Sequence, residues 1–281
     1  MPDYSKAEIR SADGTAIGYR QYGEHGPGLL LVHGGMKAAQ HFSTLAADLA
    51  DTFRVYVPDR RGRGRSGPHG PHYGVQREVE DLRALLAATG TEHVFGHSSG
   101  ALVTLRTALQ TPRLRHIALY EPPLMVEAGA IPTAWLPRYE RELDTGHPAA
   151  ALITALKGTG LEPTFSRVPR FALTPVIALG LRVQRPTPDE ATIADLIPTQ
   201  RYDMRLVREL SGTLPDYSGV PAQALLLGGT RSPAYLRAAL DALEEVLPHA
   251  QRHTFAALTH EAPENDGRPH TIAAALRQFF A

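Results

Sequence analysis

The sequence predicts an α/β fold, with a mostly parallel twisted sheet flanked by helices and a helical lid inserted after the sixth strand. In the first half of the chain, short apolar runs alternate with amphipathic helical patterns, which is typical of a helix-covered parallel sheet. From about residue 124 to residue 215 the alternation stops, and the pattern there favours helices punctuated by prolines. The alternation then resumes. We therefore expect a core of residues 1–123 and 216–281, and a lid of residues 124–215 that is an insertion, not an independent domain.

The opening of the chain predicts a hairpin followed by two buried strands. Two segments of mixed polarity flank Asp13-Gly14, which is a favourable turn pair. The continuous apolar run Leu29–Val32 suits a strand that is buried on both faces. A short helical stretch follows it, and Arg54–Pro58 is the next predicted strand.

The middle of the core predicts two helices and two strands. Valine and leucine recur at helical spacing over Val75–Ala88, which predicts an amphipathic helix. His93–Phe95 is a short strand that leads into a helix over Ala101–Gln110, and His116–Tyr120 is the sixth strand. After the insertion we expect elements in the order strand, helix, strand and helix: Ala224–Leu227, Pro233–Leu247, His253–Ala257 and a closing helix that ends at Phe280.

Composition narrows the class of protein. The 281 residues carry 29 basic and 29 acidic side chains and no cysteine, with a pI near 7.3. A chain without net charge is a poor partner for nucleic acid or an anionic membrane, and one without cysteine has no thiolate chemistry. We expect a small-molecule substrate and no cofactor, and the sequence leaves a homodimer open. The N-terminal residues lack the apolar stretch of a targeting signal, so the expected location is cytoplasmic.

The segment Gly96-His97-Ser98-Ser99-Gly100 is a G-x-S-x-G motif between a predicted strand and a predicted helix. Glycines at both ends allow a sharp turn that lifts the Ser98 hydroxyl above the sheet edge. This setting makes Ser98 the candidate nucleophile.

With this motif, the chain resembles the α/β-hydrolase superfamily, in its lid-bearing serine esterase-like branch. The other matching pieces are His33-Gly34-Gly35, the loop Asp59–Gly67 and a late histidine, His260, before the closing helix. The resemblance covers the whole chain apart from the lid. It implies that the backbone N–H groups of Gly35 and Ser99 form an oxyanion hole. Two such donors near a helix N-terminus could stabilise developing negative charge.

His260 is the candidate general base, because serine is a poor nucleophile until a base near pH 7 takes its proton. It follows the last predicted strand, as the resemblance requires. His253 and His270 are fallback candidates. His97 is expected to pack beneath the turn that carries the nucleophile.

The third member of the triad departs from the usual pattern of the superfamily. An aspartate is expected after the strand Ala224–Leu227, and Ser232 stands at that position. Glu121, directly after the sixth strand, matches an alternative position for the acid found in some branches. A Ser98–His260 dyad aided by water also stays open, as do Asp203 and Asp216 as acids.

Two further patterns suggest other chemistry. His69-x-x-His72 and His249-x3-His253 have the spacing of metal ligands, but no HExxH motif occurs and we expect no metal. The arginines at 60, 61, 63 and 65 alternate with glycines, and we expect them in a solvated loop instead of a phosphate site.

The sequence thus favours a serine hydrolase that cleaves a carboxylic ester, thioester or lactone through an acyl-Ser98 intermediate. A lyase, a cyclase or a cofactor-free haloperoxidase on the same scaffold is the alternative, as is a catalytically silent ligand-binding protein. The apolar composition of the lid, with Trp135, Phe165 and Phe171, favours a small apolar substrate. Each of these aromatics is expected in the core of the lid.

Overall fold

A computed structural model describes residues 3–127, 129–161, 167–185, 187 and 189–281. Eight strands form one sheet in the order β1-β2-β4-β3-β5-β6-β7-β8. Their bounds are β1 Ser5–Arg10, β2 Ala16–Tyr22, β3 Gly28–Val32, β4 Arg54–Pro58, β5 His93–His97, β6 His116–Tyr120, β7 Gln223–Gly229 and β8 Ala250–Phe255. β2 pairs antiparallel with β1 and β4, and every other pairing is parallel. The prediction of a mostly parallel sheet is confirmed.

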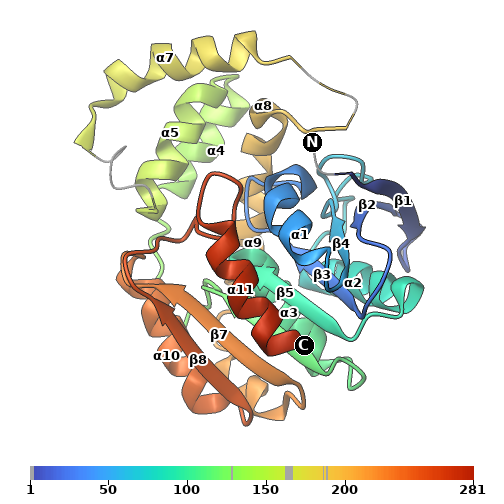
Figure 1. Cartoon of the computed structure of the whole chain (residues 1–281). Coiled ribbons are helices and arrows are strands. Elements are labelled where there is room, and N and C mark those ends of the chain that lie inside the picture. The colour runs from blue at the N-terminus through green and yellow to red at the C-terminus, as the bar shows by residue number, and fades with distance from the viewer. Residues whose placement is uncertain (1–2, 128, 162–166, 186, 188) are drawn as a thin grey trace.

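Helices cover both faces of the sheet (Figure 1). Those of the core are α1 Ser43–Leu49, α2 Val75–Thr89, α3 Ser99–Leu109, α10 Ala234–Val246 and α11 Pro269–Phe280. α1 and α11 share one apolar cluster with the sheet, while α2, α3 and α10 share the other. In β3, Leu30 belongs to the second cluster and Leu29 and Leu31 to the first, so side chains alternate between two buried faces. Burial on both faces therefore explains why the run Leu29–Val32 is apolar at every position.

The chain leaves the sheet after β6 and returns at β7, as the helical insertion predicted from the sequence requires. The insertion contains α4 Leu136–Asp144, α5 Pro148–Thr159, α7 Arg170–Val183, α8 Ile193–Leu196 and α9 Gln200–Glu209. Short 3₁₀ helices stand at η1 Ala39–Phe42, η2 Ile197–Thr199 and η3 Leu214–Gly219. α4, α5 and α7 lie together at the top of Figure 1, whereas α9 descends to the core and packs on α3.

Two aromatic side chains of the insertion have opposite environments. Trp135 is buried, and its ring lies against Gly158. Phe171 is 83% exposed on α7, which contains no buried residue, so its expected place in the core of the insertion is wrong. Phe165 lies outside the described residues. Across the described parts of the chain, each helix falls short of the length and apolar character needed to traverse a bilayer.

Candidate active site

Ser98 occupies the sharp turn between β5 and α3. Its φ of 55° and ψ of −125° lie in a region that side-chain-bearing residues rarely adopt, and its N–H donates to the carbonyl of Tyr120 at 2.9 Å. A Cβ on Gly96 would lie 2.6 Å from the Cα of Ala101, and one on Gly100 would lie 2.4 Å from the carbonyl oxygen of Val32. Both glycines of the motif are therefore required by close backbone approach.

Glu121 and His260 are joined by a hydrogen bond. Parallel pairing in register aligns the ends of β5, β6 and β7, and Glu121 follows β6 directly. Its carboxylate is fully buried. One oxygen lies 2.7 Å from His260 Nδ1, and the other accepts a hydrogen bond from the N–H of Gly229 at 2.7 Å. Because an ionised carboxylate only accepts, His260 carries its proton on Nδ1 and presents an unprotonated Nε2.

Side chains of His97 and Tyr120 hold the loop that carries His260 by hydrogen bonds to its backbone. The hydroxyl of Tyr120 donates to the carbonyl of Thr259 at 2.8 Å, and His97 Nε2 lies 3.0 Å from the carbonyl of His260. Burial, and then the proximity of His260, lower the pKa of His97 to about 3. A neutral His97 that donates from Nε2 thus supports this loop. The fallback histidines lie elsewhere: His253 is exposed within β8, and His270 pairs with Asp48 at the surface.

At the other positions considered for the acid, the described side chains do not form a hydrogen bond with His260. Ser232 is buried at the position where the superfamily usually has its aspartate, and its hydroxyl has no partner among the described residues. Asp216 pairs with Arg106 at the surface. Asp203, on α9, accepts from the hydroxyl of Ser99 at 2.7 Å instead of from a histidine.

Asp203 belongs to a buried ionic network that corrects the expectation of a solvated arginine loop. Arg60 forms a two-pronged pair with Glu78, at 2.8 and 3.0 Å, and lies 3.0 Å from Asp203. Arg63 contacts the other oxygen of Asp203 at 2.6 Å. Burial alone would raise the pKa of Asp203, but these two guanidinium groups hold it below its usual value. Among the four arginines, those at positions 60, 61 and 63 are buried, and Arg65 is the one that reaches solvent.

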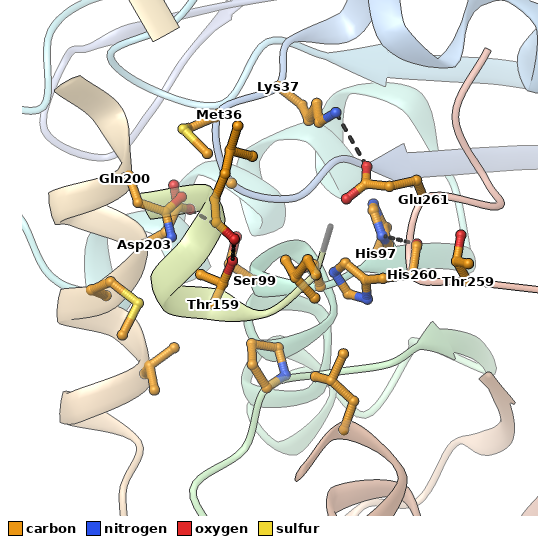
Figure 2. Close-up of a pocket in the computed structure, with 18 of the residues that line it drawn as sticks. Met36, Lys37, His97, Ser99, Thr159, Gln200, Asp203, Thr259, His260 and Glu261 are labelled. Atoms are coloured by element: carbon orange, nitrogen blue, oxygen red, sulfur yellow. Dashed lines mark hydrogen bonds and ion pairs between the residues drawn. The ribbon is translucent and has the colours of Figure 1, made fainter. Parts of the chain in front are cut away.

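A cavity of about 430 Å³ opens in front of Ser98, and Figure 2 shows the residues around it. α9 contributes Gln200 and Asp203 on one side, and His97 and His260 lie on the other. Apolar side chains make up much of the wall: Met36, Pro123, Ile131, Pro132, Leu156, Leu161, Met204, Val207 and Leu236. Such a cavity suits a small, largely apolar ligand.

The two residues proposed for the oxyanion hole, Gly35 and Ser99, both line this cavity beside Ser98. Ser99 is the first residue of α3, so its N–H precedes the helical hydrogen-bond ladder and has no carbonyl within the helix to bind. A Cβ on Gly34 would lie 2.8 Å from the Cβ of Ser98, which shows how closely this loop approaches the nucleophile.

Lys37 supplies the positive charge at the cavity wall, and it is already paired. Its ammonium group lies 3.2 Å from Glu261 and also contacts Glu264 (Figure 2 shows the first pair). Burial would lower the pKa of Lys37, but the two carboxylates raise it above its ordinary value. Within the described residues, no group of three or more histidine or acidic side chains is arranged to hold a metal ion.

Two residues of this site were missed from the sequence or given another role. Gln200 carried no signal, because a single glutamine in a predicted helix is unremarkable in chemical terms. Asp203 was considered as a catalytic acid, and its actual partners lie 104 to 143 positions away. Its position three residues after Gln200 places both on one face of α9, a signal that is readable only once the helix is known.

Comparisons with known proteins agree with this fold. An N-formylmaleamate deformylase of Pseudomonas putida is 39% identical over 119 residues, which are 41% of this chain and 44% of the relative. The match thus spans less than half of that relative's length. The structure of an alpha/beta hydrolase from Sphaerobacter thermophilus superposes with a TM-score of 0.77 at 29% identity, covering 98% of this chain and all of that one. An esterase from a Rhodococcus species gives 0.73 at 22% identity, covering 98% of each chain, which is a likeness of fold alone. The model of the alpha/beta hydrolase family matches residues 29–275, and the chain therefore belongs to that family.

Proposed function

We propose that the chain is a serine hydrolase that cleaves a carboxylic ester, thioester or lactone of a small, uncharged and largely apolar substrate. The observation that carries the proposal is the 2.7 Å hydrogen bond between Glu121 and His260, because His260 lines the same cavity as Ser98. This arrangement supplies a nucleophile, a base and an acid that orients the base.

In the first half of the proposed reaction, Ser98 Oγ attacks the carbonyl carbon, and His260 Nε2 takes the proton of the hydroxyl. Glu121 stabilises the imidazolium that forms. The carbonyl electron pair moves to oxygen, where the N–H groups of Gly35 and Ser99 stabilise the charge. His260 then gives its proton to the leaving alcohol, and an acyl group remains on Ser98.

In the second half, a water molecule takes the place of the alcohol. His260 removes a proton from this water as it attacks the acyl carbon, and then returns the proton to Ser98 Oγ. The helical insertion serves as a lid that bounds the acyl group, with Leu156 of α5 and Val207 of α9 in the cavity wall.

The charges of the cavity favour an uncharged substrate. Lys37 is neutralised by Glu261 and Glu264, and Arg60 and Arg63 are engaged with Asp203 and Glu78. Among the described residues that line the cavity, no cation stays free to pair with a substrate carboxylate. Burying an unpaired carboxylate there would be costly.

Hydrolysis of a formyl amide is the second candidate function, and the similarity to the deformylase favours it. The same three side chains would perform it, with the amide as the leaving group, protonated on its nitrogen by His260. Turnover of matched short-chain esters and N-formyl amides distinguishes the two functions. We expect the ester to be the faster substrate.

The test of the proposal is covalent labelling with a fluorophosphonate, with the adduct mapped by mass spectrometry. We expect the label on Ser98, and we expect Ser98→Ala to abolish both labelling and hydrolysis of p-nitrophenyl butyrate. Ser218→Ala, an exposed serine on η3, is the matched control and should keep full activity. Ser98→Ala activity within a few-fold of the wild type would remove Ser98 from the mechanism. Labelling without turnover of esters or amides would favour a lyase, a cyclase or a binding protein.

A further inference from the structure

The side-chain amide of Gln200 lies at the wall of the cavity and has no hydrogen-bond partner among the described residues. The residue is 8% exposed and lines the cavity, and within the described parts of the chain no hydrogen bond to its amide occurs. Buried amides are nearly always hydrogen-bonded, because an apolar environment disfavours an unpaired donor or acceptor. Because this amide lines the cavity, its partner comes from the cavity, as water in the free protein or as a ligand group in a complex.

The amide lies directly over the loop proposed to bind the substrate carbonyl. Its Oε1 would be 2.7 Å from a Cβ built on Gly35, which places it in near contact with the α-carbon of that residue. A half-turn of the amide exchanges oxygen and nitrogen, since no hydrogen bond from a described residue holds either atom. Either end of the amide can therefore face a molecule that is bound beside Gly35.

α9 holds Gln200 in this place through Asp203, which lies one helical turn further on. Asp203 is bound by Arg60, Arg63 and the hydroxyl of Ser99, all of which are buried parts of the core. Figure 2 shows Gln200 and Asp203 on the same helix, with Ser99 beside them. An amide fixed in this way needs little rearrangement when charge develops nearby, as an electrostatic catalyst requires.

We propose that Gln200 is a catalytic residue whose Nε2 donates a hydrogen bond to the substrate carbonyl oxygen. It forms a third donor beside the N–H groups of Gly35 and Ser99. When Ser98 attacks, the carbonyl π electron pair moves to this oxygen and the proton goes to His260, so the bond to Gln200 strengthens in the transition state. This inference rests on the proposed function, because it assigns a role to that same site.

The first test replaces Gln200 with methionine, which has a similar length but no donor. We expect kcat for p-nitrophenyl butyrate to fall by roughly 10- to 100-fold, because removing one oxyanion donor costs about 10²–10³ in enzymes where it has been measured. KM should change less than threefold, since the lost interaction forms mainly in the transition state. Gln76→Met, the same substitution at an exposed position of α2, is the matched control and should behave as the wild type.

The second test uses Gln200→Glu, which keeps the shape of the side chain. Its carboxylate opposes the oxyanion at high pH, and its protonated form is a donor again at low pH. The ratio of its kcat to that of the wild type should rise at least tenfold between pH 9 and pH 5.5. Taking the ratio removes the pH dependence that the two proteins have in common. A residue that merely packs at the wall would give a ratio independent of pH.

The outcomes separate this inference from the proposed function. If Ser98-dependent hydrolysis is present, but Gln200→Met keeps more than half of kcat and the Gln200→Glu ratio is flat, Gln200 is not a donor and the inference alone fails. A Gln200→Met variant that loses activity only through a higher KM, with kcat unchanged, would also contradict the inference. If wild-type protein shows no Ser98-dependent turnover or labelling, both proposals fall. Should Gln200→Met unfold in thermal denaturation, the isosteric Gln200→Glu profile decides.

Discussion

Glu121 adopts a backbone conformation that few residues with a side chain tolerate, with φ at 47°. Such a conformation costs on the order of 1–3 kcal/mol and persists only where the surroundings enforce it. Here two donors enforce it, the N–H of Gly229 on one carboxylate oxygen and His260 Nδ1 on the other. Ser98 is strained in the same sense, with φ at 55°. The two strained residues end neighbouring strands of the sheet and face one histidine loop, and we infer that the strain serves the proposed triad.

Replacing Glu121 with glutamine tests the proposed acid. A glutamine has one acceptor oxygen for two donors, so its NH₂ group must face either Gly229 or His260. The charge that favours the Nδ1–H tautomer and the imidazolium is also lost. An Asp-to-Asn change in the serine protease triad costs about 10⁴ in turnover, and we expect a loss of at least roughly 100-fold here. Because one buried donor is left without an acceptor, the free energy of unfolding should fall by about 1–3 kcal/mol, which is too little to unfold the protein under assay conditions. Glu244→Gln, at an exposed ion pair of α10, is the control. More than about a third of wild-type kcat across pH 6 to 9 would show that the acid is another group.

At the scale of elements, α9 is bound to the core by charge as well as by packing. Asp203 bridges the loop after β4, through Arg60 and Arg63, to the first residue of α3. We predict that Asp203→Asn lowers the free energy of unfolding by roughly 3 kcal/mol, because removing one partner from a buried ion pair leaves the other charge uncompensated. Urea denaturation measures this change. Asp216→Asn breaks an exposed pair with Arg106 and should cost less than about 1 kcal/mol. Equal effects of the two substitutions would contradict a structural role for the network.

Short-range signals in the sequence identify some residues of the candidate site, whereas contacts between remote segments cannot be predicted from it. Ser98 and its flanking glycines could be found from the sequence, because the signal lies within five consecutive residues and requires only a strand before it and a helix after it. Glu121 is predicted as the acid from its position at a strand end, since parallel strands align their carboxyl ends. The arginine loop was misjudged because its partner Asp203 lies 143 positions from Arg60. Burial of a charge depends on which remote segment folds over it, and composition and spacing do not carry that information.

Across the whole molecule, several histidines are held neutral by burial. Burial is the largest cause in each case: it lowers the pKa of His41 and His69 to about 4 and that of His97 to about 3, and it also lowers the pKa of His33. In the unfolded chain each of these groups titrates near 6.5. Between pH 6.5 and about 4 the unfolded state therefore binds more protons than the folded state. Stability contributed by these groups is complete above pH 6.5 and is lost as the pH falls toward 4. Asp81, whose pKa burial raises to about 6, acts in the opposite direction as a single group.

His69 allows this dependence to be measured one group at a time. Its ring stacks on Tyr202 with 3.5 Å between ring centroids, and its Nε2 has no partner among the described residues. Removing the imidazole with His69→Gln costs stability at neutral pH, but the variant no longer has this proton to gain on unfolding. Between pH 7.5 and pH 4.5 the difference in unfolding free energy between wild type and variant should therefore shift by about 2 kcal/mol in favour of the variant. Urea titrations of both proteins at the two pH values give this difference, and the contributions of the other histidines and of Asp81 cancel. A difference that stays constant with pH would mean that His69 is protonated in the folded protein as readily as in the unfolded chain.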